Sequence, residues 1–317
     1  MTTMTEIPVV DLAPYGLGVV NEDEVDTQTI RSLADSVCGA FRDIGFCYVK
    51  NHGVQQSLID RMKAVSKTFF EKPVEYKKNY ARPKTDNHGW VALERESLNP
   101  ERPGDYKEAF NYSPCADIKI LPDIDGFKAV MEDFYASSEA LSLRIFDLVS
   151  IGLDLGDNKF MRKCHALIGQ KGNCTALRSL YYPSLSTNKG LQDIKPNQVR
   201  CGEHSDYGSL TLLFQDDVGG LEVRNLHGEY IPASPIPGTI LINIGDLMQR
   251  WTADQLTATK HRVLIPEEEL RRGKSRQSVA FFLQPDDEVM IECLDKSNKY
   301  KPISSYDYLQ QRFAATY

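Results

Sequence analysis

The chain has 317 residues, of which 41% are hydrophobic and 26% charged, a composition typical of folded globular proteins that excludes a mainly disordered chain. Its 37 basic and 44 acidic residues give a net charge of −7, which argues against a protein that coats nucleic acid. No apolar run is long enough to cross a membrane, and residues 1–6 do not resemble a secretory signal. We therefore expect a cytoplasmic protein without a nucleic-acid or membrane partner; the oligomeric state stays open.

The seven cysteines are odd in number and widely spaced, and no CxxC pair occurs. This pattern predicts reduced thiols that pack as small hydrophobic side chains, rather than a disulfide framework or a zinc finger.

The first half of the chain is predicted to be rich in helices. Apolar residues recur at helical spacing in three segments, 27–42, 55–70 and 127–151, and another helix is expected near 158–167. Short strands are expected at 7–12 and 46–49. Residues 81–106 hold several prolines and glycines, which predicts a loop-rich insertion long enough to have a function.

From residue 176 onward, short apolar runs separated by turn residues replace the helices. They predict strands of a β-sandwich or barrel at 176–182, 199–203, 209–214, 221–223, 239–244, 261–265, 278–283 and 289–293, followed by a helix at 306–315. The predicted fold class is therefore α+β. A helix-rich N-terminal region, 1–175, should pack directly on a β core, 176–317, that ends in a C-terminal helix.

A candidate metal site lies in the β-rich half. His204 and Asp206 are two residues apart, so on a strand they point to the same face. His261 opens a later strand and could supply a third ligand. Two imidazoles and one carboxylate form the facial triad of non-haem Fe(II) oxygenases, although such a set could also bind Zn²⁺. By the same alternation, Cys201 is expected to face away from the site.

A candidate anion site begins the next strand. Arg276 and Ser278 share a face of that strand. A guanidinium can hold a carboxylate through two hydrogen bonds, and a serine hydroxyl can add another. The pair would suit the distal carboxylate of 2-oxoglutarate, whose 2-oxo acid end would chelate the iron.

These motifs resemble those of a known family. His204-x-Asp206, His261 and Arg276-x-Ser278, together with segments 7–12, 45–53 and 69–73, are similar to the Fe(II)- and 2-oxoglutarate-dependent dioxygenases of the isopenicillin N synthase-like type. The resemblance implies a double-stranded β-helix, or jelly-roll, core. It implies that the triad binds Fe(II), that Arg276 and Ser278 bind 2-oxoglutarate, and that Tyr182 also contacts this cosubstrate.

A closer likeness, in segments 202–216 and 311–317, is to the fungal thymine dioxygenases, although loop 184–198 differs. It implies that Arg178, Tyr207 and Phe282 bind the substrate: two aromatic rings could hold a flat ring while the arginine donates to ring carbonyls. The same aromatic residues could line the pocket of any small ligand.

The expected activity is hydroxylation of a small organic molecule, such as a pyrimidine base or another ring metabolite, with 2-oxoglutarate and O₂ converted to succinate and CO₂. Desaturation and ring closure remain open as outcomes. Two other functions also remain open: an isopenicillin N synthase-like oxidase that does not use 2-oxoglutarate, and a non-catalytic jelly-roll protein that binds or senses a ligand. The sequence does not determine whether segment 81–106 or the C-terminal helix closes over the site.

Overall fold

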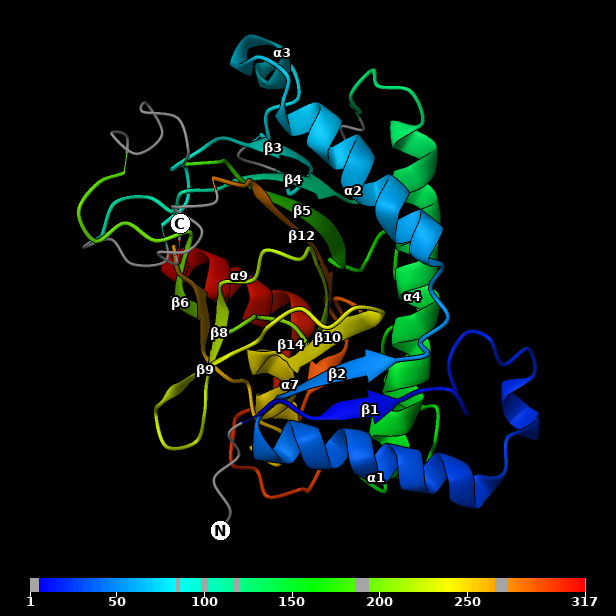
Figure 1. Ribbon diagram of the computed structural model, residues 1–317. Helices are drawn as coiled ribbons and strands as arrows, with labels where there is room; N and C mark the ends of the chain where they lie inside the picture. Colours follow the sequence, from blue (N-terminus) through cyan, green and yellow to red (C-terminus); the bar gives the residue numbers. More distant parts are fainter. Residues whose placement is uncertain are drawn as a thin grey trace.

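An eight-stranded and a four-stranded β-sheet pack against each other around a small apolar cluster, and a two-stranded sheet lies apart from them (Figure 1). A computed structural model describes residues 6–83, 86–97, 102–116, 120–185, 194–265 and 273–316. The large sheet has the order β1-β2-β10-β7-β12-β5-β4-β3, and the small sheet has the order β6-β11-β8-β9. The bounds in the large sheet are Val9–Asp11 (β1), Phe46–Lys50 (β2), Gly89–Val91 (β3), Glu108–Tyr112 (β4), Ala176–Tyr182 (β5), Leu210–Gln215 (β7), Thr239–Ile244 (β10) and Arg276–Leu283 (β12). Those in the small sheet are Cys201–His204 (β6), Leu221–Arg224 (β8), Tyr230–Pro232 (β9) and His261–Val263 (β11).

Helices cover the outer face of the large sheet. The long helix α4 (Phe127–Gly152) contacts both α1 (Thr27–Asp43) and α2 (Gln56–Phe70), and Figure 1 shows it running past both. The remaining elements of the described chain are the short 3₁₀ helix η1 (Glu22–Glu24), α3 (Val74–Lys78), α5 (Phe160–Lys163), α7 (Asp246–Trp251), the strand pair β13 (Met290–Ile291) and β14 (Ile303–Ser304), and the C-terminal helix α9 (Ser305–Thr316). No helix in the described part of the chain is both long and apolar enough to cross a lipid bilayer.

Successive side chains of the strands in the large sheet point alternately to the helix-covered core and to the cavity side of the sheet. On β10, Ile240 and Ile242 pack into the core under the helices, whereas Leu241 packs in the interior between the sheets. On β12, Val279 and Phe281 belong to the helix side. The alternate residues of β12 face the interior, because successive side chains of a strand point to opposite faces. The α+β fold with a jelly-roll core is confirmed.

Four strands of the N-terminal half extend the large sheet at both edges. Strands β1 and β2 pair beside β10, and β4 pairs with β5. The sequence prediction missed β3 and β4, placing β3 inside a loop-rich insertion. All five residues of β4 are buried, including Glu108 and Asn111, so no polar–apolar alternation marks this strand. Edge strand β3 is only three residues long.

Smaller differences from the predicted elements have local causes. Helix α5 ends at Lys163, earlier than expected, because the backbone N–H groups of Ala166 and Leu167 donate to the Asp286 carboxylate instead of continuing the helix. Gly45 joins α1 to β2 with a φ of +72°, and a Cβ there would lie 2.0 Å from the Thr257 carbonyl oxygen. Only glycine can therefore make this connection without displacing the chain.

Candidate functional site

A cavity of about 190 Å³ lies between the two sheets. The inward residues of β12 follow one another along its wall in the order Arg276, Ser278, Ala280 and Phe282. Antiparallel β5 runs alongside and places Tyr182 opposite Arg276 and Arg178 opposite Ala280. The cavity thus has two ends, both set by the register of one strand pair.

His204, Asp206 and His261 meet on one side of this cavity. His204 ends β6, His261 begins β11, and the two are direct partners in the ladder of the small sheet. The Nε2 atom of each imidazole lies 3.7 Å from Asp206 Oδ1. Each of the three residues offers one ligand atom, and these three atoms lie within 4.8 Å of one another. A single metal ion can therefore contact all three residues.

Both imidazoles are oriented by backbone carbonyl groups. His204 Nδ1 is 2.8 Å from the Gly202 oxygen, and His261 Nδ1 is 3.0 Å from the Thr259 oxygen. A hydrogen on each Nδ1 leaves the lone pair of Nε2 for a metal ion. Burial lowers the pKa of His261 to about 4, which favours this neutral form.

The two oxygens of Asp206 have different surroundings. Oδ1 faces the imidazoles, whereas Oδ2 accepts hydrogen bonds from Thr211 Oγ1 at 2.6 Å and Asn243 Nδ2 at 2.7 Å. Burial alone would raise the pKa of the Asp206 carboxyl, but the two histidines and these two donors hold it below its usual value. Thr211 and Asn243 were missed in the sequence, although a lone asparagine in the apolar run of β10 is a readable signal.

The donor set fits Fe(II), because two neutral imidazoles and one carboxylate leave other coordination positions open. Arg276 lies at the end of the cavity beyond this triad and is almost completely buried. Its Nε donates to the Gly219 oxygen at 2.7 Å, and Nη1 and Nη2 lie 3.4 Å from Ser278 Oγ and 3.3 Å from Gln215 Oε1. Its guanidinium carbon is 4.8 Å from the centre of the Tyr182 ring, and burial raises the pKa of that phenol. The structure therefore brings the side chains of Arg276, Ser278 and Tyr182 together at this end of the cavity.

Arg178, Tyr207 and Phe282 also line the cavity. Arg178 forms an ion pair with Glu96. Glu96 is not among the predicted site residues, because it lies in the segment predicted to be a loop-rich insertion. Tyr207 lies edge-on to Phe313 of α9, with ring centres 6.2 Å apart, and the Arg312 guanidinium carbon is 4.8 Å from its ring centre.

Two distant segments complete the cavity wall. Asn87 and Glu96 come from segment 81–106, and Leu309 and Phe313 come from α9. Both segments whose position the sequence left open therefore reach the site. Within loop 184–198, residues 186–193 lie outside the described part of the chain.

Cys201 lies in the cavity wall, contrary to prediction. Its Sγ is 3.9 Å from His204 Nδ1 and 3.4 Å from Lys107 Nζ. The register between β6 and β11 shifts, since His261 pairs with His204 but Val263 pairs with Cys201. This β-bulge breaks the strict alternation on which the prediction depended.

Two family models match most of the chain. Residues 7–133 match the N-terminal region of the non-haem dioxygenase in morphine synthesis, and residues 173–285 match the 2OG-Fe(II) oxygenase superfamily. Among similar proteins, proline hydroxylase buaE of Petromyces alliaceus is 33% identical over 88% of this chain and 91% of its own length. The 2-oxoglutarate-dependent dioxygenase htyE of Aspergillus rugulosus is 32% identical over 89% of this chain and 92% of its own length.

Solved structures give the same assignment. Neurospora crassa thymine-7-hydroxylase, solved with 2-oxoglutarate and thymine, superposes with a TM-score of 0.83 at 30% identity, covering 98% of this chain and 97% of that one. A 2OG-Fe(II) oxygenase family protein from Caulobacter crescentus superposes with a TM-score of 0.78 at 25% identity, covering 99% of each chain. The chain therefore belongs to the 2OG-Fe(II) oxygenase superfamily and is an Fe(II)- and 2-oxoglutarate-dependent dioxygenase.

Proposed function

We propose that His204, Asp206 and His261 bind Fe(II), and that Arg276, Ser278 and Tyr182 bind the distal carboxylate end of 2-oxoglutarate. The observation that carries this assignment is that the three donor atoms and the buried Arg276 guanidinium face one cavity. The Arg276 hydrogen bonds support the second role, because a guanidinium held before its ligand arrives loses little entropy on binding.

The bound iron and 2-oxoglutarate supply the oxidising chemistry, and the protein supplies orientation and shielding. Arg276 and Ser278 fix one end of the cosubstrate, while the triad fixes the other. Arg178, Tyr207 and Phe282 hold the substrate on the remaining wall. Aromatic side chains there would keep water from the reacting atoms and position a ring by its faces.

We propose a small polar ring compound as substrate and hydroxylation as the outcome. A pyrimidine base fits two aromatic residues and one arginine, and the thymine complex of the Neurospora relative supports this class. A cyclic amino acid is the second candidate, favoured by the opposite charges of Arg178 and Glu96 in the cavity wall and by the name of the buaE relative.

We also propose that residues 1–175 form a supporting region for the core at 176–317. Four strands of the N-terminal region belong to the same large sheet as the core strands, which supports one continuous domain in which the N-terminal region stabilises the core. The seven cysteines are all free thiols, which supports a location in a reducing compartment such as the cytoplasm.

The test is succinate formation by protein loaded anaerobically with Fe(II) and 2-oxoglutarate and then exposed to O₂. We expect slow succinate release alone and faster release with thymine, uracil, L-proline or a related ring compound. Succinate release that none of these ring compounds accelerates would contradict the proposed substrate class.

Matched variants test the residue assignments. We expect His204→Ala to abolish iron binding and succinate formation. The control is His227→Ala, which should change neither, because His227 is exposed and lies in a turn. Arg276→Leu should raise KM for 2-oxoglutarate about 100-fold, since a buried charge-assisted carboxylate contact is lost. An unchanged KM for this variant would contradict the assignment of the cosubstrate end.

A further inference from the structure

Two side chains of opposite charge meet on the substrate side of the cavity. Arg178 comes from β5, and Glu96 comes from the segment between β3 and β4; Arg178 Nη2 donates to Glu96 Oε2. Their side chains are 14% and 9% exposed, and both line the cavity. A carboxylate acceptor and a guanidinium donor are therefore presented side by side to a molecule that enters this end.

Glu96 stays ionised in this buried position. Burial would raise the pKa of its carboxyl, but the positive charges of Arg178, Lys107 and Arg82 lower that pKa to about 2. Arg82 Nη1 lies 3.6 Å from Glu96 Oε1, and Lys107 Nζ lies 2.5 Å from Asp105 Oδ2. The cluster of three cations and two carboxylates has a net charge of +1. It therefore disfavours a substrate that is only a cation and suits a neutral molecule or one with a carboxylate.

Polar groups are concentrated at this end of the substrate wall. Asn111 of β4 is the ladder partner of Arg178 and also lines the cavity, and its Nδ2 donates to Asn87 Oδ1 at 2.8 Å. Neighbouring cavity positions on the sheet are apolar, among them Ala176 and Ala280. A few placed polar groups in an otherwise apolar wall are what fixes the orientation of a small ligand.

We propose that Glu96 and Arg178 act as one recognition unit for a substrate edge on which an N–H group adjoins a carbonyl or carboxylate oxygen. The N–H donates to the Glu96 carboxylate, and the oxygen accepts from the Arg178 guanidinium. The N–H and C=O edge of a pyrimidine has this arrangement, and so do the ammonium and carboxylate of a cyclic amino acid. This inference rests on the proposed function and makes Glu96 a specificity-determining residue.

The test compares substrates with and without the N–H group. Binding is measured without turnover, by calorimetry on anaerobic protein loaded with Mn(II) and 2-oxoglutarate. The two arms are thymine against its N-methyl derivatives, and L-proline against N,N-dimethylproline. For whichever of the two compounds binds, we expect N-methylation to weaken binding about ten- to a hundredfold, since the ligand loses its hydrogen bond to a charged, buried carboxylate that stays paired with Arg178.

Protein variants separate recognition from mere positioning of Arg178. The isosteric variant Glu96→Gln should bind the unmethylated ligand about tenfold or more weakly, and should discriminate less against the methylated one. Glu94→Gln is the matched control, because Glu94 lies in the same segment but pairs with Lys195 and Gln198. It should behave as wild type.

The outcomes distinguish this inference from the function on which it rests. If Glu96 only positions Arg178, the Gln variant will bind all ligands equally weakly and keep the full wild-type discrimination against N-methylation, which overturns the inference. Lack of binding by every N–H-bearing compound, with succinate formation intact, also overturns it and leaves the oxygenase assignment standing. Loss of succinate formation in wild-type protein would remove the proposed function itself.

Discussion

The carboxylate of Asp206 shows how single residues prepare the metal site. One oxygen faces the two imidazoles, and the other is held by Thr211 and Asn243. Because both donors bind Oδ2, Oδ1 is left to serve as a single-oxygen ligand. Groups that orient a ligand in this way commonly contribute 10–100-fold to metal affinity.

We therefore expect Thr211→Val and Asn243→Leu each to weaken Mn(II) or Fe(II) binding about 10–100-fold. Metal affinity is measured directly, by calorimetry or by competition with a chelator, so that the result does not depend on turnover. Thr239→Val is the control, because Thr239 begins the same strand as Asn243 but its hydroxyl donates to the Ile236 oxygen at the surface. Equal metal affinity in all three variants would show that Asp206 needs no such support.

At the residue scale, period-two alternation predicts the direction of a side chain where the strand is regular. Arg276 and Ser278 were found by period-two alternation, because β12 is an unbroken strand of eight residues. The same rule failed for Cys201, where the β6–β11 register contains a bulge. Glu96 carries no local signal: only the folded chain brings it beside Arg178.

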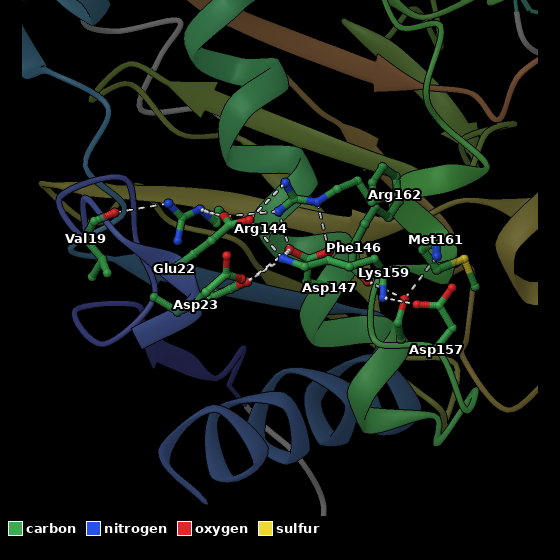
Figure 2. Close-up of polar contacts among 12 residues, drawn as sticks. Val19, Glu22, Asp23, Arg144, Phe146, Asp147, Asp157, Lys159, Met161 and Arg162 are labelled. Atoms are coloured by element: carbon green, nitrogen blue, oxygen red, sulfur yellow. Dashed lines mark hydrogen bonds and ion pairs between the residues drawn. The ribbon is translucent and has the colours of Figure 1, made fainter. Parts of the chain in front are cut away.

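At the scale of elements, helix α4 ties the N-terminal segment to the region around α5. Asp147 of α4 is 1% exposed and forms ion pairs with Lys159 and Arg162, while the Tyr15 hydroxyl donates to it at 3.0 Å. Figure 2 shows Glu22 from the N-terminal segment in the same network, where it pairs with Arg144 at 2.7 Å and Lys159 at 2.9 Å. The network joins segments that are far apart in the sequence.

We expect Asp147→Asn to lower the free energy of unfolding by about 2–4 kcal/mol, because two partly buried cations lose a buried counter-ion. The value should stay near the lower end, since Lys159 and Arg162 keep 32% and 27% of their side chains exposed. Asp157→Asn, which affects the exposed pair with Lys163, should cost less than about 1 kcal/mol. Chemical denaturation measures both; similar losses in the two variants would contradict the importance of burial.

The elements themselves were predicted unevenly, and physical reasons account for the pattern. Two helices, α1 and α2, bury one face, and their apolar residues recur at helical spacing. Strands β5 and β10 bury both faces and are short apolar runs. Strands β3, β4 and β9 are short or carry buried polar residues, so their pairing depends on neighbours that are distant in sequence. Tertiary pairing, rather than local pattern, makes them strands.

At the scale of the whole molecule, the site is made from parts of the chain that only folding brings together. The proposed metal ligands come from residues 204–261, the proposed cosubstrate-binding residues Arg276 and Ser278 from β12, and further wall residues from segment 81–106 and α9. An unfolded chain cannot assemble these groups, so ligands that bind them must favour the native state. Ligand binding is thus coupled to global stability.

We expect Mn(II) and 2-oxoglutarate, each at about 100 times its dissociation constant, to stabilise the fold in two increments of about 2.7 kcal/mol each. For a chain of 317 residues each increment corresponds to a rise in Tm of roughly 4 °C. His261→Ala should abolish the metal increment and, with it, most of the increment from 2-oxoglutarate. Arg276→Leu should keep the metal increment and lose most of the second. Full stabilisation by 2-oxoglutarate in both variants would mean that the cosubstrate binds elsewhere, because the proposed site holds one end of it through the metal and the other through the Arg276 guanidinium.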